Sequence, residues 1–150
     1  MFKVEAGGRQ LGLKPLRGIW GSQGGDSRVE GAGKKRVLVV DDDPGVLSLL
    51  RHTLETVGYE VHTATSGSQG FAMWQENHYA LVITDLVLAA SGGVDLVRRI
   101  RATDNQIPIL AITGFGQEVA QEALDAGADH VLRKPFHLFE VRELVRRLMA

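Results

Sequence analysis

Four carboxylates follow two short apolar runs, and these acids are the residues of the chain best suited to chemistry. The run at 37–40 (Val-Leu-Val-Val) opens directly onto three consecutive acids, Asp41 to Asp43, and the run at 80–84 leads into Asp85. If both runs are neighbouring parallel strands, all four acids meet at the carboxyl edge of one sheet, where open α/β folds place their sites. Such a gathering of like charges indicates a divalent metal and a phosphoryl group.

The acids are of the type that a hard cation prefers. The carboxylate oxygens of Asp41, Asp42 and Asp85 suit Mg²⁺ or Mn²⁺, and Mg²⁺ typically takes one or two carboxylates together with phosphate oxygens. Without a metal, like-charge repulsion raises one or more pKa values in such a cluster. Helix capping is the competing interpretation. It explains Asp43, which precedes Pro44, but it does not explain Asp85.

Two further strand ends carry groups that suit phosphoryl oxygens. The apolar run at 109–112 leads into Thr113, and the short run at 130–132 is followed, after one arginine, by Lys134. A hydroxyl can donate to one phosphoryl oxygen, and a lysine amine can neutralise another. Taken singly, each residue is an ordinary strand end or a solvated charge. Together with the acids they provide a nucleophile, a metal site, a hydroxyl donor and a cation.

Strand-like and helix-like patterns alternate from residue 35 onward and predict the elements that position these groups. Apolar runs typical of a sheet covered on both faces predict strands at Arg36–Val40, Tyr59–Ala64, Ala80–Thr84, Ile107–Ile112 and His130–Leu132. Helical spacing of apolar residues predicts helices at 44–57 (closed by Gly58), 70–78, 94–101, 117–126 and 138–149. The third of these should expose Arg98, Arg99 and Arg101. The pattern predicts an α/β fold, a doubly wound five-stranded parallel sheet flanked by five helices.

The bulk composition limits what the chain can be. Its 150 residues suffice for one domain with a sizeable core, and 44% hydrophobic and 23% charged residues are ordinary for a globular protein. A net charge of -1 gives no argument for nucleic acid or membrane, and zero cysteines exclude disulfides and thiolate chemistry. No apolar stretch approaches the ~20 residues of a membrane helix, and the amino terminus lacks a signal-peptide core. A cytoplasmic protein without membrane contact is expected.

The composition changes near residue 34. Residues 1–34 hold nine of the 18 glycines, carry six basic against three acidic side chains, and show no sustained periodicity. Because few apolar residues are present to offset the entropy of ordering, we expect a flexible, glycine-rich basic tail. The domain itself is expected to span residues 35–150.

Residues 35–150 resemble the receiver domain of two-component response regulators, which has a flavodoxin-like fold. The order and spacing of four segments carry the resemblance: Val-Leu-Val-Val-Asp41-Asp42-Asp43-Pro44, Leu-Val-Ile-Thr-Asp85-Leu, Ile-Leu-Ala-Ile-Thr113-Gly114 and Gly-Ala-Asp-His-Val-Leu-Arg-Lys134-Pro135-Phe136. The resemblance implies that Asp85 accepts a phosphoryl group from a phosphohistidine on a sensor histidine kinase or phosphotransfer protein in a phosphorelay. It also implies a Mg²⁺ site made of Asp42, Asp85 and the backbone carbonyl of Val87, with Asp41 acting through water.

The same resemblance assigns the remaining roles. Thr113 and Lys134 would hold the phosphoryl oxygens, and the Lys134-Pro135 bond is expected to be cis. The chain would be no enzyme beyond Mg²⁺-dependent self-phosphorylation and slow self-dephosphorylation. We expect no dedicated nucleic-acid-binding domain and no output domain after residue 150, so the chain should act by docking on a downstream protein. The candidate surface is the face of residues 117–149, with a basic cast from Arg133, Arg142, Arg146 and Arg147.

Three departures from the family pattern affect the expected conformational response and the expected lifetime of the phosphoryl group on Asp85. The segment 88–93 keeps only the second glycine of the usual loop, so a more mobile loop is expected. Val131 stands where the family commonly has an aromatic residue whose rotamer couples to Thr113. This predicts a muted or rewired conformational output, which would run through the loop after Thr113 and the helix from Gln117, or through His130 and Arg133. Val87 and Phe115 are apolar at positions that influence the hydrolytic water, so slow loss of the phosphoryl group is expected.

Two other interpretations start from the same residues. A pseudo-receiver would be an interaction module of this fold that takes no phosphate. A haloacid-dehalogenase-like phosphatase would use Asp41 to Asp43 as its first motif, but Gly45 stands where Thr or Val is needed, and Asp129 offers one late acid in an unsuitable setting. The histidines lie on separate predicted elements, so we expect surface or packing roles for them rather than a metal site. They are His52, His62, His78, His130 and His137.

Overall fold

A computed structural model of the protein describes residues 33–88, 92–114 and 116–150. The predicted tail at 1–34, apart from its last two positions, lies outside these residues, as do Ala89 to Ser91 of the predicted loop and Phe115. In the described part of the chain, no helix is long and apolar enough to cross a membrane.

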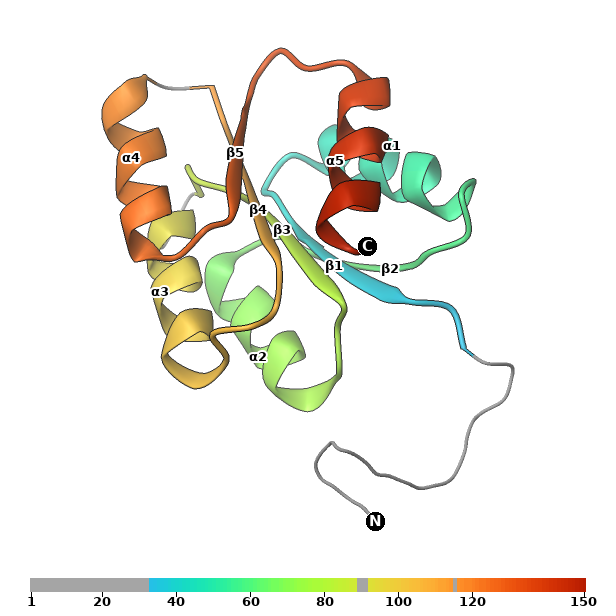
Figure 1. The fold of residues 1–150 in the computed structure, drawn as a ribbon, viewed down its shortest axis with the longest axis horizontal. Helices are drawn as coiled ribbons and strands as arrows, with labels where there is room; N and C mark the ends of the chain where they lie inside the picture. The colour runs from blue at the N-terminus through green and yellow to red at the C-terminus, as the bar shows by residue number, and fades with distance from the viewer. Residues whose placement is uncertain (1–32, 89–91, 115) are drawn as a thin grey trace. The chain divides into compact units, whose positions relative to one another are not determined.

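The strands of the described residues form one five-stranded parallel sheet in the order β2-β1-β3-β4-β5 (Figure 1). They are β1 (Arg36–Val40), β2 (Glu60–Ala64), β3 (Leu81–Asp85), β4 (Ile109–Thr113) and β5 (His130–Arg133). β1 is central to the site because it pairs with β3 and places Val40 in register with Thr84. β3 in turn places Asp85 in register with Ile112 of β4. The residues that follow these positions therefore leave the sheet at one common edge.

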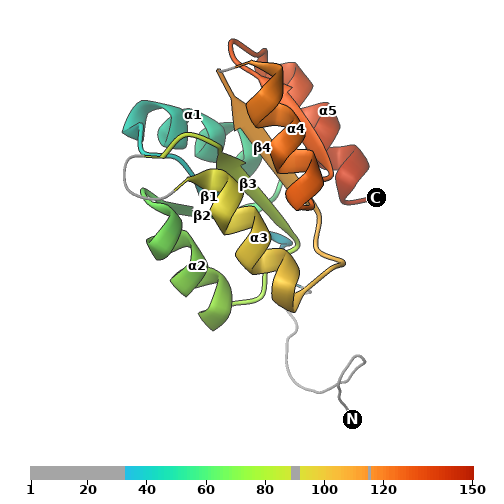
Figure 2. The same ribbon diagram turned by 90° about the vertical axis from the view of Figure 1, so that its left-hand side faces the viewer.

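Five helices of the described residues cover the two faces of the sheet (Figure 2). They are α1 (Pro44–Glu55), α2 (Gly67–Glu76), α3 (Gly93–Thr103), α4 (Gln117–Ala126) and α5 (Leu138–Leu148). α1 and α5 pack on one face, and α2, α3 and α4 pack on the other. Successive residues of a strand pack into hydrophobic cores on opposite faces of the sheet. Val39 packs toward α1 and α5, and Val40 packs toward α2 and α3. The predicted doubly wound α/β fold is confirmed.

The start of α1 confirms the capping prediction. The Asp43 carboxylate accepts a hydrogen bond from the Gly45 amide at 2.8 Å, and Pro44 occupies the first turn. The helix ends at Glu55, before the predicted end at residue 57, and a turn follows it. Gly58 closes that turn with a φ of +100°, a backbone conformation that favours glycine.

α2 starts earlier than the sequence pattern indicates. The glycines before residue 70 predict a turn followed by a helix at 70–78, but the helix begins at Gly67 and ends before residue 78. Ser66 is its N-cap, and the Ser66 hydroxyl accepts a hydrogen bond from the Gln69 amide at 3.1 Å. The prediction was wrong because the capping hydroxyl and the burial of Gly67 outweigh the low helix propensity of glycine.

β3 and β4 each end one residue later than predicted. β3 includes Asp85, which pairs in register with Ile112, and β4 includes Thr113, which pairs in register with Arg133. β4 also begins at Ile109 rather than at residue 107. Asp85 and Thr113 are therefore the last residues of their strands, and the sheet itself holds their backbone.

Arg101 does not lie on the exposed face of α3, contrary to the prediction. Its side chain is 14% exposed, and its guanidinium donates to the backbone carbonyls of Gly127 at 2.8 Å and Ile107 at 2.6 Å. Carbonyl groups in the turns before β4 and β5 need donors, and the long arginine side chain reaches both from the end of α3. Arg98 and Arg99 are exposed, as predicted.

Candidate phosphoacceptor and metal site

Three of the predicted acids come together at the carboxyl edge of the sheet. Asp41 and Asp42 follow β1, and Asp85 ends the neighbouring strand β3. One carboxylate oxygen of each lies within 4.8 Å of those of the other two. Asp41 and Asp85 are buried, at 2% and 6% exposure, whereas Asp42 is exposed. The cluster therefore has a solvent-facing side at Asp42.

Lys134 brings a positive charge to this cluster. Its Nζ atom donates to Oδ2 of Asp85 at 3.0 Å and lies 3.6 Å from Oδ2 of Asp41. The backbone fixes its position, because the Lys134 amide donates to the carbonyl of Thr113 at 2.8 Å. The Lys134-Pro135 peptide bond is cis, as predicted. The ammonium group thus reaches the acids from the residue that follows β5.

Burial and neighbouring charges shift the pKa of two of these groups. Burial raises the pKa of Asp41 above its ordinary value of 3.8. The Asp85 charge adds to that rise, while the hydrogen bond from the Asp43 amide and the Lys134 charge oppose it. Burial lowers the pKa of Lys134, but its hydrogen bond to Asp85 and the charges of both buried acids outweigh burial and raise it. Lys134 is therefore protonated at neutral pH.

Two donors orient the Asp85 carboxylate. Oδ2 accepts from Lys134, and Oδ1 accepts from the Val87 amide at 3.1 Å. The intervening backbone is fixed as well, because the Leu86 amide donates to the carbonyl of Ile112 at 2.9 Å. The Val87 residue is 44% exposed. The nucleophile candidate is thus held in one orientation while the residue two positions later borders solvent.

Two further predicted residues lie beside the cluster. Thr113 ends β4 and is fully buried, and its carbonyl accepts the hydrogen bond from the Lys134 amide. Asp43 is exposed and caps α1, and its amide donates to Oδ1 of Asp41 at 2.9 Å. The structure therefore assigns the Asp43 side chain to the helix and places Thr113 at the strand end that adjoins the acids.

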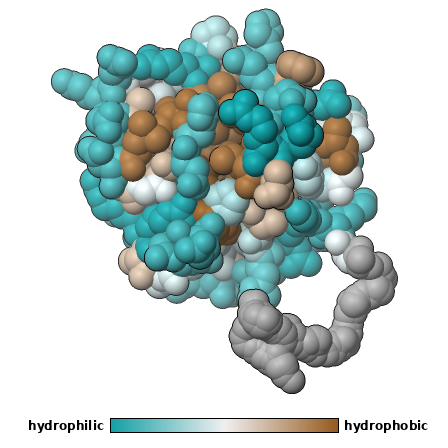
Figure 3. Space-filling model, viewed as in Figure 1, coloured by the Kyte–Doolittle hydropathy of each residue, from teal (hydrophilic) through white to brown (hydrophobic). Residues whose placement is uncertain are grey.

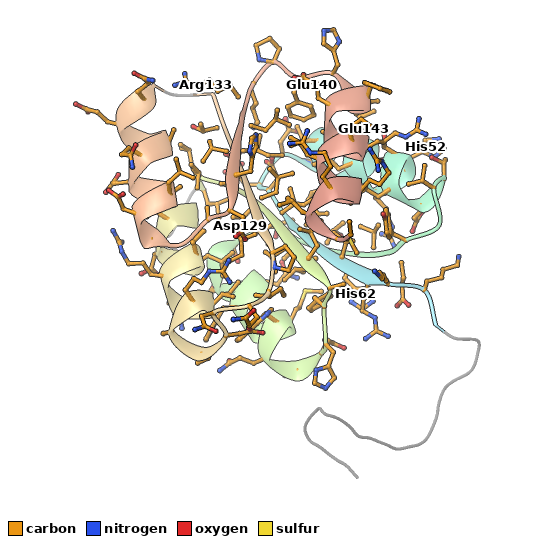
Figure 4. All side chains as sticks on the ribbon, in the orientation of Figure 1. His52, His62, Asp129, Arg133, Glu140 and Glu143 are labelled. Atoms are coloured by element: carbon orange, nitrogen blue, oxygen red, sulfur yellow. The ribbon has the colours of Figure 1, made fainter. Side chains whose placement is uncertain are left out.

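Asp129, the late acid considered for a phosphatase, lies at the opposite edge of the sheet. It precedes β5, whereas Arg133 ends that strand, and Figure 4 shows the two residues at opposite ends of β5. One Asp129 oxygen accepts from Arg101 and from the Ile109 amide, both at 2.8 Å. This carboxylate holds the beginning of β4 and does not join the acids that follow β1.

The histidines take no part in the acid cluster. Within the described residues, the group of side chains that could hold a metal consists of acids only, at positions 41, 42 and 85. His62 instead bridges two neighbours: one ring nitrogen lies 2.8 Å from the Tyr79 hydroxyl and the other 3.0 Å from the Glu60 carboxylate. His62 therefore makes packing and hydrogen-bond contacts at a distance from the acid cluster.

Sequence reasoning missed two residues that contact the backbone of Asp85. The Thr84 hydroxyl donates to the Asp85 carbonyl at 2.8 Å. Gly93 lies so close to the same carbonyl that a Cβ atom there would overlap it. The signal for Thr84 is a hydroxyl inside an otherwise apolar strand, and the signal for Gly93 is a glycine at the start of a helix.

The donor set of the cluster fits a hard divalent cation. Its ligand atoms are carboxylate oxygens, which suit Mg²⁺ or Mn²⁺ better than the softer metals that prefer sulfur or imidazole. Three carboxylates face one ammonium group, so the cluster keeps an excess of negative charge that a divalent cation would offset. The exposed Asp42 gives such an ion access from solvent.

The protein is an open parallel α/β sheet that gathers acids and a lysine at its carboxyl edge. Residues 37–146 match the family described as response regulator receiver domain, and the chain belongs to this family. The family and the fold predicted from the sequence are thereby confirmed, and they place the chain in two-component signal transduction.

Relatives and solved structures agree with this assignment. The transcriptional regulatory protein SrrA of Staphylococcus aureus is 34% identical over 115 residues, which cover 76% of this chain and 46% of that protein. The chain thus spans about half the length of the curated relatives it matches. The CheY-like receiver domain protein of Methanospirillum hungatei superposes with a TM-score of 0.76 at 28% identity, covering 78% of this chain and 94% of that one. Response regulator TrrA of Thermotoga maritima, in complex with Mg²⁺-BeF, gives a TM-score of 0.71 at 32% identity over 76% of this chain and 98% of that one.

Proposed function

We propose that Asp85 accepts a phosphoryl group from a phosphohistidine, carried by a sensor histidine kinase or a phosphotransfer protein. The observation that carries the proposal is the buried Asp85 carboxylate, which Lys134 holds at 3.0 Å beside a second buried acid. Phosphoryl transfer to a carboxylate needs a positioned nucleophile and cationic groups that offset the charge of the phosphoryl oxygens. Asp85 and Lys134 supply both at an edge of the sheet that borders solvent.

The transfer is an in-line attack by one Asp85 oxygen on phosphorus. A bond forms between that oxygen and phosphorus while the P–N bond of the phosphohistidine breaks. The electron pair of the broken bond returns to the imidazole nitrogen, and solvent supplies the proton that leaves a neutral imidazole. The product is a mixed anhydride on Asp85. Lys134 holds a carboxylate oxygen before transfer, and its ammonium has further donors for an oxygen of the phosphoryl group.

The residues that would hold Mg²⁺ are Asp42, Asp85 and the backbone carbonyl of Val87, with Asp41 acting through water. When bound, the ion offsets the negative charge that the acids and the phosphoryl oxygens bring together. The chain keeps these acids in place, since the Asp43 amide donates to Asp41 and the Val87 amide donates to Asp85. The TrrA complex with Mg²⁺-BeF supports this assignment by similarity.

The remaining contacts with the phosphoryl group are assigned to Thr113 and Lys134. Thr113 ends the strand next to Asp85, and its carbonyl is tied to the Lys134 amide at 2.8 Å. Both residues therefore stand at neighbouring strand ends, where a hydroxyl and an ammonium can meet different oxygens of one phosphoryl group.

Labelling with a small phosphodonor tests the proposal. In radiolabelled acetyl phosphate and Mg²⁺, the parent protein should take up a hydroxylamine-sensitive phosphoryl group, and EDTA should prevent the uptake. Asp85→Asn should remove the label. Asp43→Asn is the matched control, because it changes a nearby acid while keeping a good helix cap, and it should label like the parent. Absence of label on the folded parent would contradict the proposal and favour a pseudo-receiver, an interaction module of the same fold.

We further propose that the phosphorylated chain signals through the face of residues 117–149. This face carries a shallow groove of about 370 Å³ lined by Gln117, Glu118, Ala120, Gln121, Leu124 and Arg133. Leu124 is 42% exposed, and Phe139 at the start of α5 is 68% exposed. Figure 3 shows apolar side chains gathered between α4 and α5, bordered by hydrophilic ones. Exposed apolar groups rimmed by charge are typical of a protein docking surface.

The readout in this chain differs from the aromatic switch of the family because Val131 has no ring to move. Val131 is half-buried and packs against the core on the α2, α3 and α4 side of the sheet. We therefore expect the response to reach α4 through the segment that follows Thr113. Amide chemical-shift changes on addition of beryllofluoride and Mg²⁺ should appear in α4. Large changes confined to residues 130–134 would contradict this route.

A further inference from the structure

A hydroxyl is buried inside β3, directly before the phosphoacceptor candidate. Thr84 is fully buried and stands in register with Val40 and Ala111, two apolar residues that are also fully buried. Burying a hydroxyl in such surroundings is unfavourable unless it finds a hydrogen-bond partner. Valine has nearly the same shape and would suit the layer better. The hydroxyl therefore requires an explanation other than packing.

The partner of this hydroxyl is the backbone of Asp85. The Thr84 Oγ1 atom donates to the Asp85 carbonyl oxygen at 2.8 Å. Gly93, the first residue of α3, closes on the same carbonyl from the helix, and a Cβ at this position would overlap the Asp85 oxygen. The Gly93 amide also donates to the Leu86 carbonyl at 3.0 Å. The peptide group between Asp85 and Leu86 is thus held by a hydroxyl and by the close approach of a helix.

The orientation of this peptide group decides where the carboxylate points. The Leu86 amide belongs to the same peptide and donates to Ile112 at 2.9 Å, and one residue later the Val87 amide donates to Oδ1 of Asp85 at 3.1 Å. If the peptide rotates, the Val87 amide leaves the carboxylate oxygen that it holds. A nucleophile that is held in its attack geometry reacts faster than one that samples several orientations.

We infer that the Thr84 hydroxyl is a positioning group for phosphoryl transfer, because it fixes the Asp85–Leu86 peptide and, through the Val87 amide, the Asp85 carboxylate. The inference rests on the proposed function. It adds Thr84 to the residues already assigned to the site, which are the acids, Thr113 and Lys134. Gly93 contributes the space that lets α3 approach the same carbonyl. The Thr84 hydroxyl bonds to the backbone carbonyl of Asp85 and not to its carboxylate, so it acts on the rate through the position of Asp85.

The test compares two changes at Thr84 that differ only in the hydroxyl. Thr84→Val keeps the shape and removes the donor, whereas Thr84→Ser keeps the donor. In acetyl phosphate and saturating Mg²⁺, Thr84→Val should lower the maximal labelling rate about three- to tenfold, the effect of one ordinary hydrogen bond. The donor concentration at half-maximal rate should not change. Thr84→Ser should keep at least about half of the parent rate, since its hydroxyl still reaches the carbonyl.

Stability and spectroscopy separate positioning from a structural role. Thr84→Val should melt close to the parent, because the apolar layer gains an apolar group while the Asp85 carbonyl loses one donor. Thr53→Val is the matched control: Thr53 is a buried threonine in α1, and its replacement should leave the labelling rate unchanged. The Val87 amide resonance should move in Thr84→Val and stay near the parent position in Thr84→Ser. Thr84→Ala, a second variant without the hydroxyl, should be slow as well.

The outcomes distinguish this inference from the proposed function. A folded parent that takes no label at Asp85 contradicts the proposed function. A parent that labels, with Thr84→Val and Thr84→Ala as fast as Thr84→Ser, overturns the positioning role while the proposed function stands. Slow labelling of Thr84→Val together with a clear loss of thermal stability and an unmoved Val87 amide would also overturn it, since the effect would then come from general unfolding.

Discussion

Replacing Asp41 by asparagine should stabilise the metal-free protein. Asp41 is 2% exposed, and its carboxylate offers an oxygen within 4.8 Å of oxygens of Asp42 and Asp85. The replacement removes one charge from the cluster and changes the side-chain shape very little. It also keeps the hydrogen bond from the Asp43 amide, because the carbonyl oxygen of asparagine accepts it equally. The variant therefore isolates the effect of charge.

The magnitude follows from the separations in the cluster. At an effective dielectric constant of about 20, unit charges within 4.8 Å of each other repel by at least about 3.5 kcal/mol, and Lys134 at 3.6 Å attracts Asp41 by about 4.6 kcal/mol. The two repulsions exceed the one attraction by at least about 2 kcal/mol. Solvent at the exposed Asp42 weakens one repulsion, while burial of Asp41 adds a cost. We expect the free energy of unfolding to rise by about 1–2 kcal/mol, or about 4–8 °C in Tm.

Unfolding in EDTA and in excess Mg²⁺, followed by circular dichroism, measures this effect. In EDTA, Asp41→Asn should melt above the parent. Mg²⁺ should stabilise the parent more than the variant, because ligand binding adds RT ln(1 + [Mg²⁺]/Kd) and the variant has lost an acid near the ion. Asp43→Asn, which changes an exposed capping acid, should shift either melting curve much less. A variant that melts below the parent in EDTA, or gains as much from Mg²⁺, would refute the argument from charge repulsion.

The same reasoning gives the sign of a pH dependence in EDTA. Burial, the largest cause, raises the pKa of Asp41 in the folded state above 3.8. The folded protein therefore binds this proton at a higher pH than the unfolded chain does, and the group costs stability as pH rises. The cost is absent below pH 3.8 and complete above the folded pKa. The stability advantage of Asp41→Asn should shrink as the pH is lowered toward 3.8, and an advantage that stays constant with pH would contradict the assignment.

Three further predictions concern single side chains. Arg101→Met should lower the free energy of unfolding by about 2 kcal/mol, because two turns lose the donor to their carbonyls; urea unfolding that shows no loss would contradict this role. Val87→Asn should shorten the lifetime of the phosphoryl label on Asp85, since an amide can place the hydrolytic water that an exposed valine cannot; equal lifetimes would count against shielding. The pKa of Glu60 lies below 4.5, mainly because of its hydrogen bond with His62. The Glu60 carboxylate therefore stabilises the fold above pH 4.5, and this stabilisation is lost as the pH falls through the pKa of Glu60 in the folded state. Glu60→Gln should therefore cost less than about 1 kcal/mol at neutral pH, where solvent weakens the contact, and nothing in acid.

Most of the fold was predictable because a parallel sheet covered on both faces needs continuous apolar strands. β1 satisfies that rule directly, since Val37 to Val40 are fully buried. The rule fails at strand ends: Asp85 and Thr113 are polar, yet both still belong to their strands. It also fails at the start of α2, where glycine predicts a turn. There the Ser66 hydroxyl caps the helix locally, and the burial of Gly67 is known only from the folded chain.

The acids of the site were predictable from topology, because neighbouring parallel strands end at one edge. The contacts that orient them were not. The hydrogen bond from Thr84 to Asp85 depends on the side-chain rotamer of Thr84, and the close approach of Gly93 depends on how α3 meets β3; no spacing in the sequence specifies either contact. Arg101 was misplaced for a similar reason. Helical periodicity assigns a charged residue to solvent, and only the folded chain brings the turn at Gly127 within its reach.

The contacts around Asp85 separate a fixed part of the site from a part that can respond to phosphate. The backbone at Asp85 is held by the Thr84 hydroxyl, by the Leu86 amide on β4 and by the approach of α3. Lys134, in contrast, meets Asp85 through the end of a flexible four-carbon side chain that is 30% exposed. A new charge on Asp85 should therefore be met by movement of Lys134 and of the β4 end to which its amide is bonded at Thr113. Because Val131 offers no ring to carry that movement along β5, the segment from Thr113 to α4 is where the proposed response should be sought.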